Sequence, residues 1–147
     1  MLKNWRPKES SQNFRSKALY NYYRPEWEPP LLACAAGLAT LEVYREEDLF
    51  ARAAELAPYF QEAVHSLADC KNVIDVRNLG LMGAIELESI AGKPTVRAME
   101  AFQKAFERGL LVRTTGDTIA LSPPLIVERK HIDFIAETVR DVIETVH

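Results

Sequence analysis

The sequence predicts an α+β fold in which helices cover a small, largely antiparallel sheet, preceded by an irregular N-terminal arm. The chain has 147 residues, enough for one domain with its own hydrophobic core. It is 48% hydrophobic and 27% charged, as soluble globular proteins are. Segments of strand character come in adjacent pairs between segments of helical periodicity, a pattern that favours hairpins over parallel crossover units.

Residues 1–30 differ in composition from the rest. Apart from Glu9, the charged residues of the first 24 positions are basic, and aromatic residues lie between them. Pro25, Pro29 and Pro30 rule out a helix through the end of this segment. We therefore expect an extended or partly disordered arm over 1–30 and a folded domain over 31–147. A solvated or oligomer-contacting arm is favoured, while single-stranded nucleic acid binding and a targeting leader stay open.

Two helices should follow the arm. Leu38, Leu41 and Tyr44 recur at three-residue steps in the first, which ends in a charged run. Asp48 is a plausible N-cap for the second. Pro58 predicts a kink in this second helix near Ala57. The apolar face of the second helix should contain Phe50, Ala53, Ala57, Phe60, Val64 and Leu67.

Residues 72–79 and 81–88 read as a pair of strands, since branched residues are frequent in both. Gly80 and Gly83 indicate a tight turn or a close backbone approach. Pro94 and Thr95 should open a third helix, and Gly109 should end it in the left-handed conformation. One face of that helix carries Val96, Met99, Phe102 and Phe106.

Short strands are expected over residues 110–113 and 118–121, around a turn at Thr114–Asp117. The last helix shows three-and-four spacing to the end of the chain. Its predicted core positions are Ile132, Ile135, Val139, Val142 or Ile143, and Val146.

Arg113 is the main candidate for a functional residue. It lies at the mouth of the last hairpin, and its guanidinium offers a planar fork of donors that matches a carboxylate. At the end of a buried strand such a group would anchor a carboxylate ligand; the alternative is a surface arginine paired with Asp117 or a glutamate. Asp117 should shape the turn through side-chain-to-backbone bonds, and a second option makes it the partner that orients Arg113.

Other kinds of site find little support. His65, His131 and His147 are scattered, and Cys34 and Cys70 lack metal-ligand spacing, so no metal site is predicted. We expect both cysteines to be reduced and packed. The net charge of −3 predicts no polyanionic partner for the chain as a whole. No apolar run is long enough to cross a membrane, and we expect a cytoplasmic protein.

Four segments resemble the C-terminal part of class III (omega-type) pyridoxal-phosphate-dependent aminotransferases. They are residues 33–41, 53–60, 76–83 and 109–125, and the omega-amino-acid:pyruvate branch is the most similar. The resemblance implies the small C-terminal domain of that fold. It also implies that Arg113 matches the arginine that binds the substrate carboxylate in this family. In some members this arginine side chain swings aside to admit a substrate without a carboxylate.

The same resemblance implies residues that this chain lacks. The lysine that forms a Schiff base with pyridoxal phosphate, and the carboxylate that pairs with the ring nitrogen, belong to a large upstream domain. Glu26 stands where the family has a threonine that binds the cofactor phosphate. We therefore expect a truncated chain with no catalytic or cofactor-binding residue of its own, and pyridoxal phosphate not bound by this chain alone.

Two functions follow as hypotheses. The first is an aminotransferase-like protein, transferring an amino group between an amino acid or amine and a keto acid such as pyruvate, and inactive as an isolated chain. The alternative is a non-catalytic carboxylate-binding or protein-interaction module. Expected partners are a small carboxylate and either a second copy or a complementary large-domain chain; no membrane is expected, and nucleic acid is disfavoured. An oligomer would form through the arm and the first helix.

Overall fold

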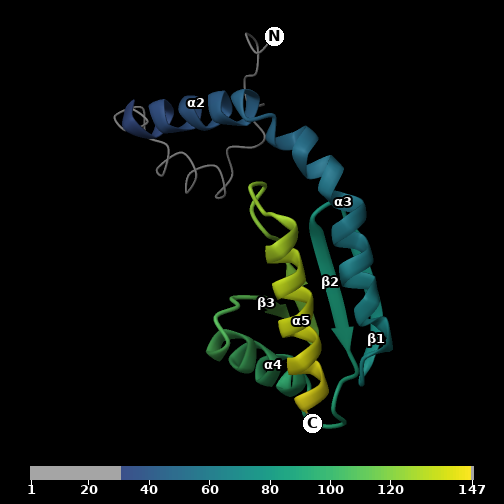
Figure 1. Ribbon diagram of the computed structural model, residues 1–147. Helices are drawn as coiled ribbons and strands as arrows, with labels where there is room; N and C mark the ends of the chain where they lie inside the picture. The colour runs from purple at the N-terminus through teal and green to yellow at the C-terminus, as the bar shows by residue number, and fades with distance from the viewer. Residues whose placement is uncertain (1–30, 147) are drawn as a thin grey trace, which may run out of the picture. The chain divides into compact units, whose positions relative to one another are not determined.

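The computed structural model describes residues 31–146 of the chain (Figure 1). These fall into two compact units, one up to Val43 and one from Tyr44 onward. The predicted arm lies outside the described residues, so the boundary at residue 31 stays a prediction. The elements follow the predicted order: α2 Leu31–Glu46, α3 Leu49–His65, the short 3-10 helix η2 Ser66–Asp69, β1 Val73–Leu79, β2 Met82–Leu87, α4 Val96–Glu107, β3 Arg113–Thr115, β4 Thr118–Leu121 and α5 Arg129–Thr145.

Helix α2 presents its side chains to the exterior. Every residue from Ala33 to Val43 is exposed, including Leu38 and Leu41. Cys34 lies on this helix and is exposed too, so the expectation that both cysteines are packed was wrong for Cys34. Over residues 31–146, every helix is too short or too polar to cross a bilayer.

The second unit contains one four-stranded sheet with the order β1-β2-β4-β3, antiparallel at each pairing. Helices α3, α4 and α5 cover one face of it, and α5 packs against both of the others (Figure 1). The predicted α+β class and antiparallel sheet are confirmed. Because β1 and β3 are the two edges, the last hairpin of the chain has one strand in the sheet interior and one at its rim.

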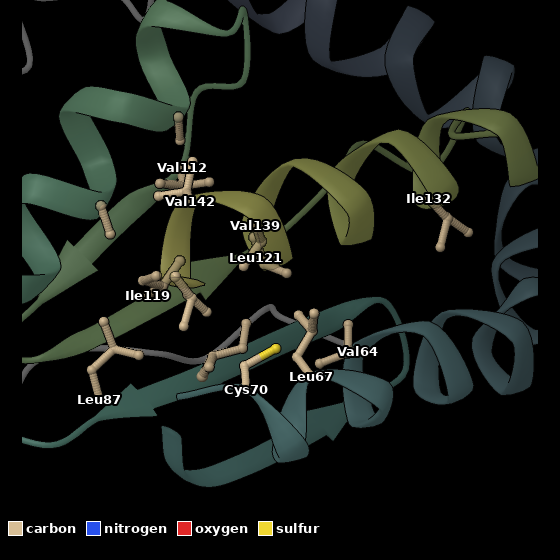
Figure 2. Packing of buried hydrophobic residues seen from close by; sticks show 14 of the residues in the cluster. Val64, Leu67, Cys70, Leu87, Val112, Ile119, Leu121, Ile132, Val139 and Val142 are labelled. Carbon is tan, nitrogen blue, oxygen red and sulfur yellow. The ribbon is translucent and has the colours of Figure 1, made fainter. Parts of the chain in front are cut away.

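The core lies between the sheet and the helices, as Figure 2 shows for Val64 of α3, Leu87 of β2, Ile119 and Leu121 of β4, and Val139 of α5. Strand β2 directs every second residue inward. Gly83 is one of these positions, and a Cβ there would lie 3.2 Å from the ring of Phe60. The predicted close backbone approach at Gly83 is therefore confirmed, and Gly80 forms the β1–β2 turn with φ +57°.

The core positions of α5 were predicted correctly, since Ile132, Val139, Val142, Ile143 and Val146 are all buried and Ile135 is half-buried. Helix α3 differs by one residue: Leu49 is buried, whereas Phe50 is exposed and packs edge-on against Tyr44. Pro58 lies inside α3 without ending it.

Helix α4 turns a different face to the core than its large side chains suggest. Ala98, Ala101 and Ala105 are buried, whereas Val96, Met99 and Phe106 are exposed. Small side chains let α4 approach α5 and the sheet closely, and this face therefore packs. Of the predicted face residues, only Phe102 packs against the core, where it is half-buried. Gly109 ends the helix region with φ +83°, as predicted.

Strand β3 is shorter and later than predicted. It begins at Arg113, so Leu110–Val112 lie before the strand instead of within it. Arg113 is opposite Ala120, so an extension of β3 from Val112 back to Leu110 would run beside Leu121-Ser122-Pro123. Proline has no N–H to donate to a ladder, so Pro123 limits how far the hairpin could extend toward Leu110.

Candidate carboxylate-binding site

Arg113 is the first residue of β3, at the open end of the β3–β4 hairpin. Its side chain is exposed on an edge strand, which corrects the expectation that it would end a buried strand. Within residues 31–146 its guanidinium has neither a hydrogen bond nor an ion pair. The alternative of a surface arginine paired with Asp117 or a glutamate is therefore not observed, and all the donors of the fork are available.

A cavity of about 650 Å³ opens beside Arg113. Its walls are mostly apolar, and no carboxylate occurs among the described residues that line it. Arg113 is its one permanently charged lining group. An anion that entered would be held in surroundings of low polarity, where a charge-assisted bond is stronger than in water. The lining residues come from α4, from the segment before β3, from the hairpin, from the Pro-Pro exit and from α5: Phe102, Leu110, Leu111, Val112, Arg113, Thr114, Ala120, Leu121, Ser122, Pro123, Pro124, Ile126, Val127, His131 and Ile135.

Asp117 occupies the tip of the same hairpin. With Gly116, whose φ is +61°, it makes the two-residue loop between Thr115 and Thr118; glycine at the first loop position is typical of a type II′ turn. The Asp117 carboxylate accepts a hydrogen bond of 2.8 Å from the Thr95 N–H, and its carbonyl accepts one of 2.9 Å from the Leu87 N–H. The side chain thus bonds to the start of α4. No hydrogen bond joins it to Arg113 in the described chain, and its orienting role stays a prediction.

Two contacts near this hairpin were missed from the sequence. Arg97 is buried and donates to the Glu88 carbonyl, so it fixes the loop before α4. Thr114 packs its hydroxyl 3.6 Å from the sulfur of Met99. The signal for Arg97 was present in the spacing, because it lies four residues before Ala101 and eight before Ala105, on the face of α4 that packs.

The remaining polar groups serve structure. His131 lines the cavity, and its Nδ1 accepts a 3.2 Å hydrogen bond from the Glu128 N–H at the start of α5. A hydrogen bond from Lys130 lowers the pKa of Glu128. Within residues 31–146 no group of three or more His, Cys, Asp or Glu side chains could hold a metal ion; His147 lies outside that range.

On the opposite side of α5, burial raises the pKa of the Cys70 thiol. Arg140 lies 3.4 Å from its sulfur and donates at 2.7 Å to the Ser66 carbonyl. A hydrogen bond with Asp133 raises the pKa of Tyr59, and the guanidinium of Arg129 lies 4.7 Å from the centre of the Tyr59 ring. The Tyr59 contacts hold the N-terminal part of α5 to α3, and the Arg140 contacts hold its C-terminal half to η2. None of them brings a second reactive group to Arg113.

The sequence is similar to curated aminotransferases. An omega-aminotransferase of Caulobacter vibrioides is 66% identical over 112 residues, which cover 76% of this chain and 26% of that protein. A beta-alanine–pyruvate aminotransferase of Pseudomonas aeruginosa is 41% identical over 112 residues, covering 76% of this chain and 25% of that protein. The chain thus spans about a quarter of the length of these relatives.

The fold is similar to solved aminotransferases as well. A transaminase solved with L-alanine has a TM-score of 0.70 at 30% identity, covering 76% of this chain and 28% of that one. An adenosylmethionine-8-amino-7-oxononanoate aminotransferase from Methanocaldococcus jannaschii has a TM-score of 0.71 at 27% identity, covering 77% of this chain and 27% of that one.

The family model for class III aminotransferases matches residues 25–143. This range includes the cavity, the hairpin that carries Arg113 and all three helices that cover the sheet. With most of the chain matched, the protein belongs to the class III aminotransferase family.

Proposed function

We propose that residues 31–146 act as the carboxylate-binding domain of a class III aminotransferase, in which Arg113 holds the carboxylate of an amino acid or keto acid. The observation that carries this proposal is the unpaired Arg113 guanidinium beside a cavity with mostly apolar walls. A planar fork in such surroundings can bind a carboxylate through two parallel bonds. The similarity to omega-amino-acid and beta-alanine–pyruvate enzymes supports pyruvate as the ligand to test.

Pyridoxal phosphate, on which the family depends, supplies the electron sink for amino-group transfer when it is bound. Its attachment requires a lysine in the active-site pocket. None of the described lysines lines the cavity. Lys104 is paired with Glu100 and Lys130 with Glu128, while Lys71 and Lys93 are exposed. The residues described here therefore do not fit the cofactor, and we assign them no step that passes through it.

Amino-group transfer then requires a cofactor-binding part in addition to residues 31–146. The exposed apolar residues of α2, among them Leu38 and Leu41, support association through that helix, either with such a chain or with a second copy. We further propose that this association takes place in the cytoplasm. The alternative of a non-catalytic interaction module is not favoured, because the relatives reported above are aminotransferases.

The test is binding of pyruvate to the 147-residue chain, measured by isothermal titration calorimetry. Arg113→Ala removes a charge-assisted bidentate contact and should weaken binding by about 10- to 100-fold. Arg113→Lys keeps the positive charge but loses the planar fork of donors, so its affinity for pyruvate should lie between those of the wild type and Arg113→Ala. The matched control is Arg77→Ala, since Arg77 is an exposed arginine on β1, the opposite edge of the same sheet. Equal affinity of the wild type and Arg113→Ala would refute the role of Arg113.

A further inference from the structure

The hairpin that presents Arg113 is held at its tip by one carboxylate. Asp117 accepts the Thr95 N–H at 2.8 Å through its side chain and the Leu87 N–H at 2.9 Å through its carbonyl. The first bond reaches the start of α4 and the second reaches the end of β2. Only the first depends on the identity of the side chain, so substitution of Asp117 leaves the backbone attachment of the tip to β2 in place.

Strand β3 has few other constraints. It is an edge strand of three residues, and within residues 31–146 its only strand partner is β4. Its remaining support comes from α4, including the contact between Thr114 and Met99. The C-terminal end of α4 continues through Gly109 and Leu110–Val112 directly into Arg113. The helix is therefore joined to the hairpin covalently at one end and through the Asp117 carboxylate at the other.

The residue that receives this bond is itself in an uncommon conformation. Thr95 caps α4 with φ +68°, in the left-handed region that β-branched residues avoid, and its side chain makes no capping hydrogen bond. The helix N-terminus carries a partial positive charge that favours an anionic acceptor. Asp117 supplies one, and Arg97 fixes the preceding loop through the Glu88 carbonyl.

From these contacts we infer that Asp117 is a positioning residue for Arg113. Its carboxylate keeps the first turn of α4 against the hairpin tip, and this fixes where the edge strand presents the guanidinium at its other end. Arg113 lies three residues before Gly116, roughly 10 Å along an extended strand. Movement at the tip would therefore be transmitted to the guanidinium. The consequence for ligand affinity rests on the proposed function, whereas the consequence for the order of β3 does not.

The test uses the full 147-residue chain and two measurements. The first is amide hydrogen exchange of Arg113–Thr115, compared with the interior strand β2 of the same molecule. Asp117→Ala should speed exchange in β3 by about tenfold and leave β2 unchanged, because the loss of one charged acceptor frees the edge strand locally. Asp117→Asn keeps an acceptor oxygen without the charge, and exchange should fall between the other two forms.

The second measurement is pyruvate affinity, which should fall by about five- to tenfold in Asp117→Ala as the fraction of molecules with a correctly placed Arg113 decreases. Two controls accompany it. Thr95→Gly keeps the N–H donor and should leave affinity unchanged. Asp141→Asn removes a carboxylate that pairs with Arg108 away from the cavity and should also have no effect.

The outcomes separate the two proposals. If wild type and Arg113→Ala bind pyruvate equally, the proposed function fails, and the exchange data alone decide the role of Asp117. Unchanged exchange in β3 of Asp117→Ala overturns the inference. So does faster exchange in β2 and β3 alike, since that would mean general loss of stability. Wild-type affinity of Asp117→Ala, with Arg113→Ala impaired, overturns it as well.

Discussion

Gly83 allows α3 to approach β2, and its replacement by alanine tests the packing on which the sheet depends. The added Cβ would lie 3.2 Å from two carbon atoms of the Phe60 ring and 3.4 Å from a methyl carbon of Val64. Carbon atoms pack best at about 3.5–4.0 Å, so the neighbours would have to move by a few tenths of an ångström. Phe60 is fully buried and cannot move outward, so the strain must fall on the separation of α3 from the sheet.

Overpacking of this kind costs about 1–3 kcal/mol, and the lower conformational entropy of unfolded alanine returns about 0.5–1 kcal/mol. We therefore expect Gly83→Ala to lower the free energy of unfolding by about 1–2 kcal/mol, or Tm by roughly 2–8 °C in a chain of this size. Urea and thermal unfolding followed by circular dichroism measure both quantities.

Two variants make the result specific. Gly37→Ala, in α2, meets no atom within 4 Å and should not lower stability. In the double variant with Phe60→Leu, the smaller side chain relieves the contact, so the combined loss should be less than the sum of the single losses. If Gly83→Ala is as stable as the wild type or more so, the close approach of α3 to β2 described here is incorrect.

The remaining predictions concern the cysteines and the start of α5. Iodoacetamide at mildly alkaline pH should alkylate the exposed Cys34 well before Cys70, because burial raises the pKa of Cys70 and lowers its thiolate fraction. Mass spectrometry identifies the alkylated residue. Equal alkylation rates of the two cysteines in the folded protein would contradict the burial of Cys70. Lys130→Met should raise the lowered pKa of Glu128. A carboxyl group whose pKa is lower in the folded than in the unfolded protein stabilises the fold at a pH above its unfolded pKa. This stabilisation is lost as the pH falls through the folded pKa. The wild type should therefore be more stable than Lys130→Met at neutral pH and equally stable in acid. Urea unfolding at several pH values from neutral to acid measures this. A difference in unfolding free energy between the two proteins that persists in acid would exclude the link to the Glu128 pKa.

The order of elements could be predicted because each is encoded by its own local pattern. Helix α5 shows this, since its core residues repeat at three and four positions and all the principal ones are buried. Helix α4 shows the limit of such reasoning: Val96, Met99 and Phe106 are exposed, because the alanine face allows the closer packing. Which face packs depends on neighbours that are distant in sequence, and local periodicity does not contain that information.

The candidate site could likewise be predicted from the sequence only in part. Arg113 could be identified from its residue type and its position before a turn. Its exposure on an edge strand could not, because it depends on the order of the strands in the sheet and on where the pairing of β3 with β4 begins. The bond from Asp117 to Thr95 joins residues 22 positions apart and has no signature in either segment. Tertiary contacts of single polar atoms are thus the part of this site that only the structure supplies.

The proposed carboxylate-anchoring role of Arg113 is tested most directly by comparing pyruvate with its methyl ester, which keeps the keto-acid skeleton of pyruvate and replaces the charged carboxylate by a neutral ester. Affinities of both for the wild type and for Arg113→Ala, measured by calorimetry, isolate the energy that couples the guanidinium to the carboxylate. We expect Arg113→Ala to weaken pyruvate binding by at least about tenfold and to leave the binding of the ester unchanged. An equal loss for both ligands, or no loss for either, would contradict the assignment of Arg113 as the carboxylate anchor.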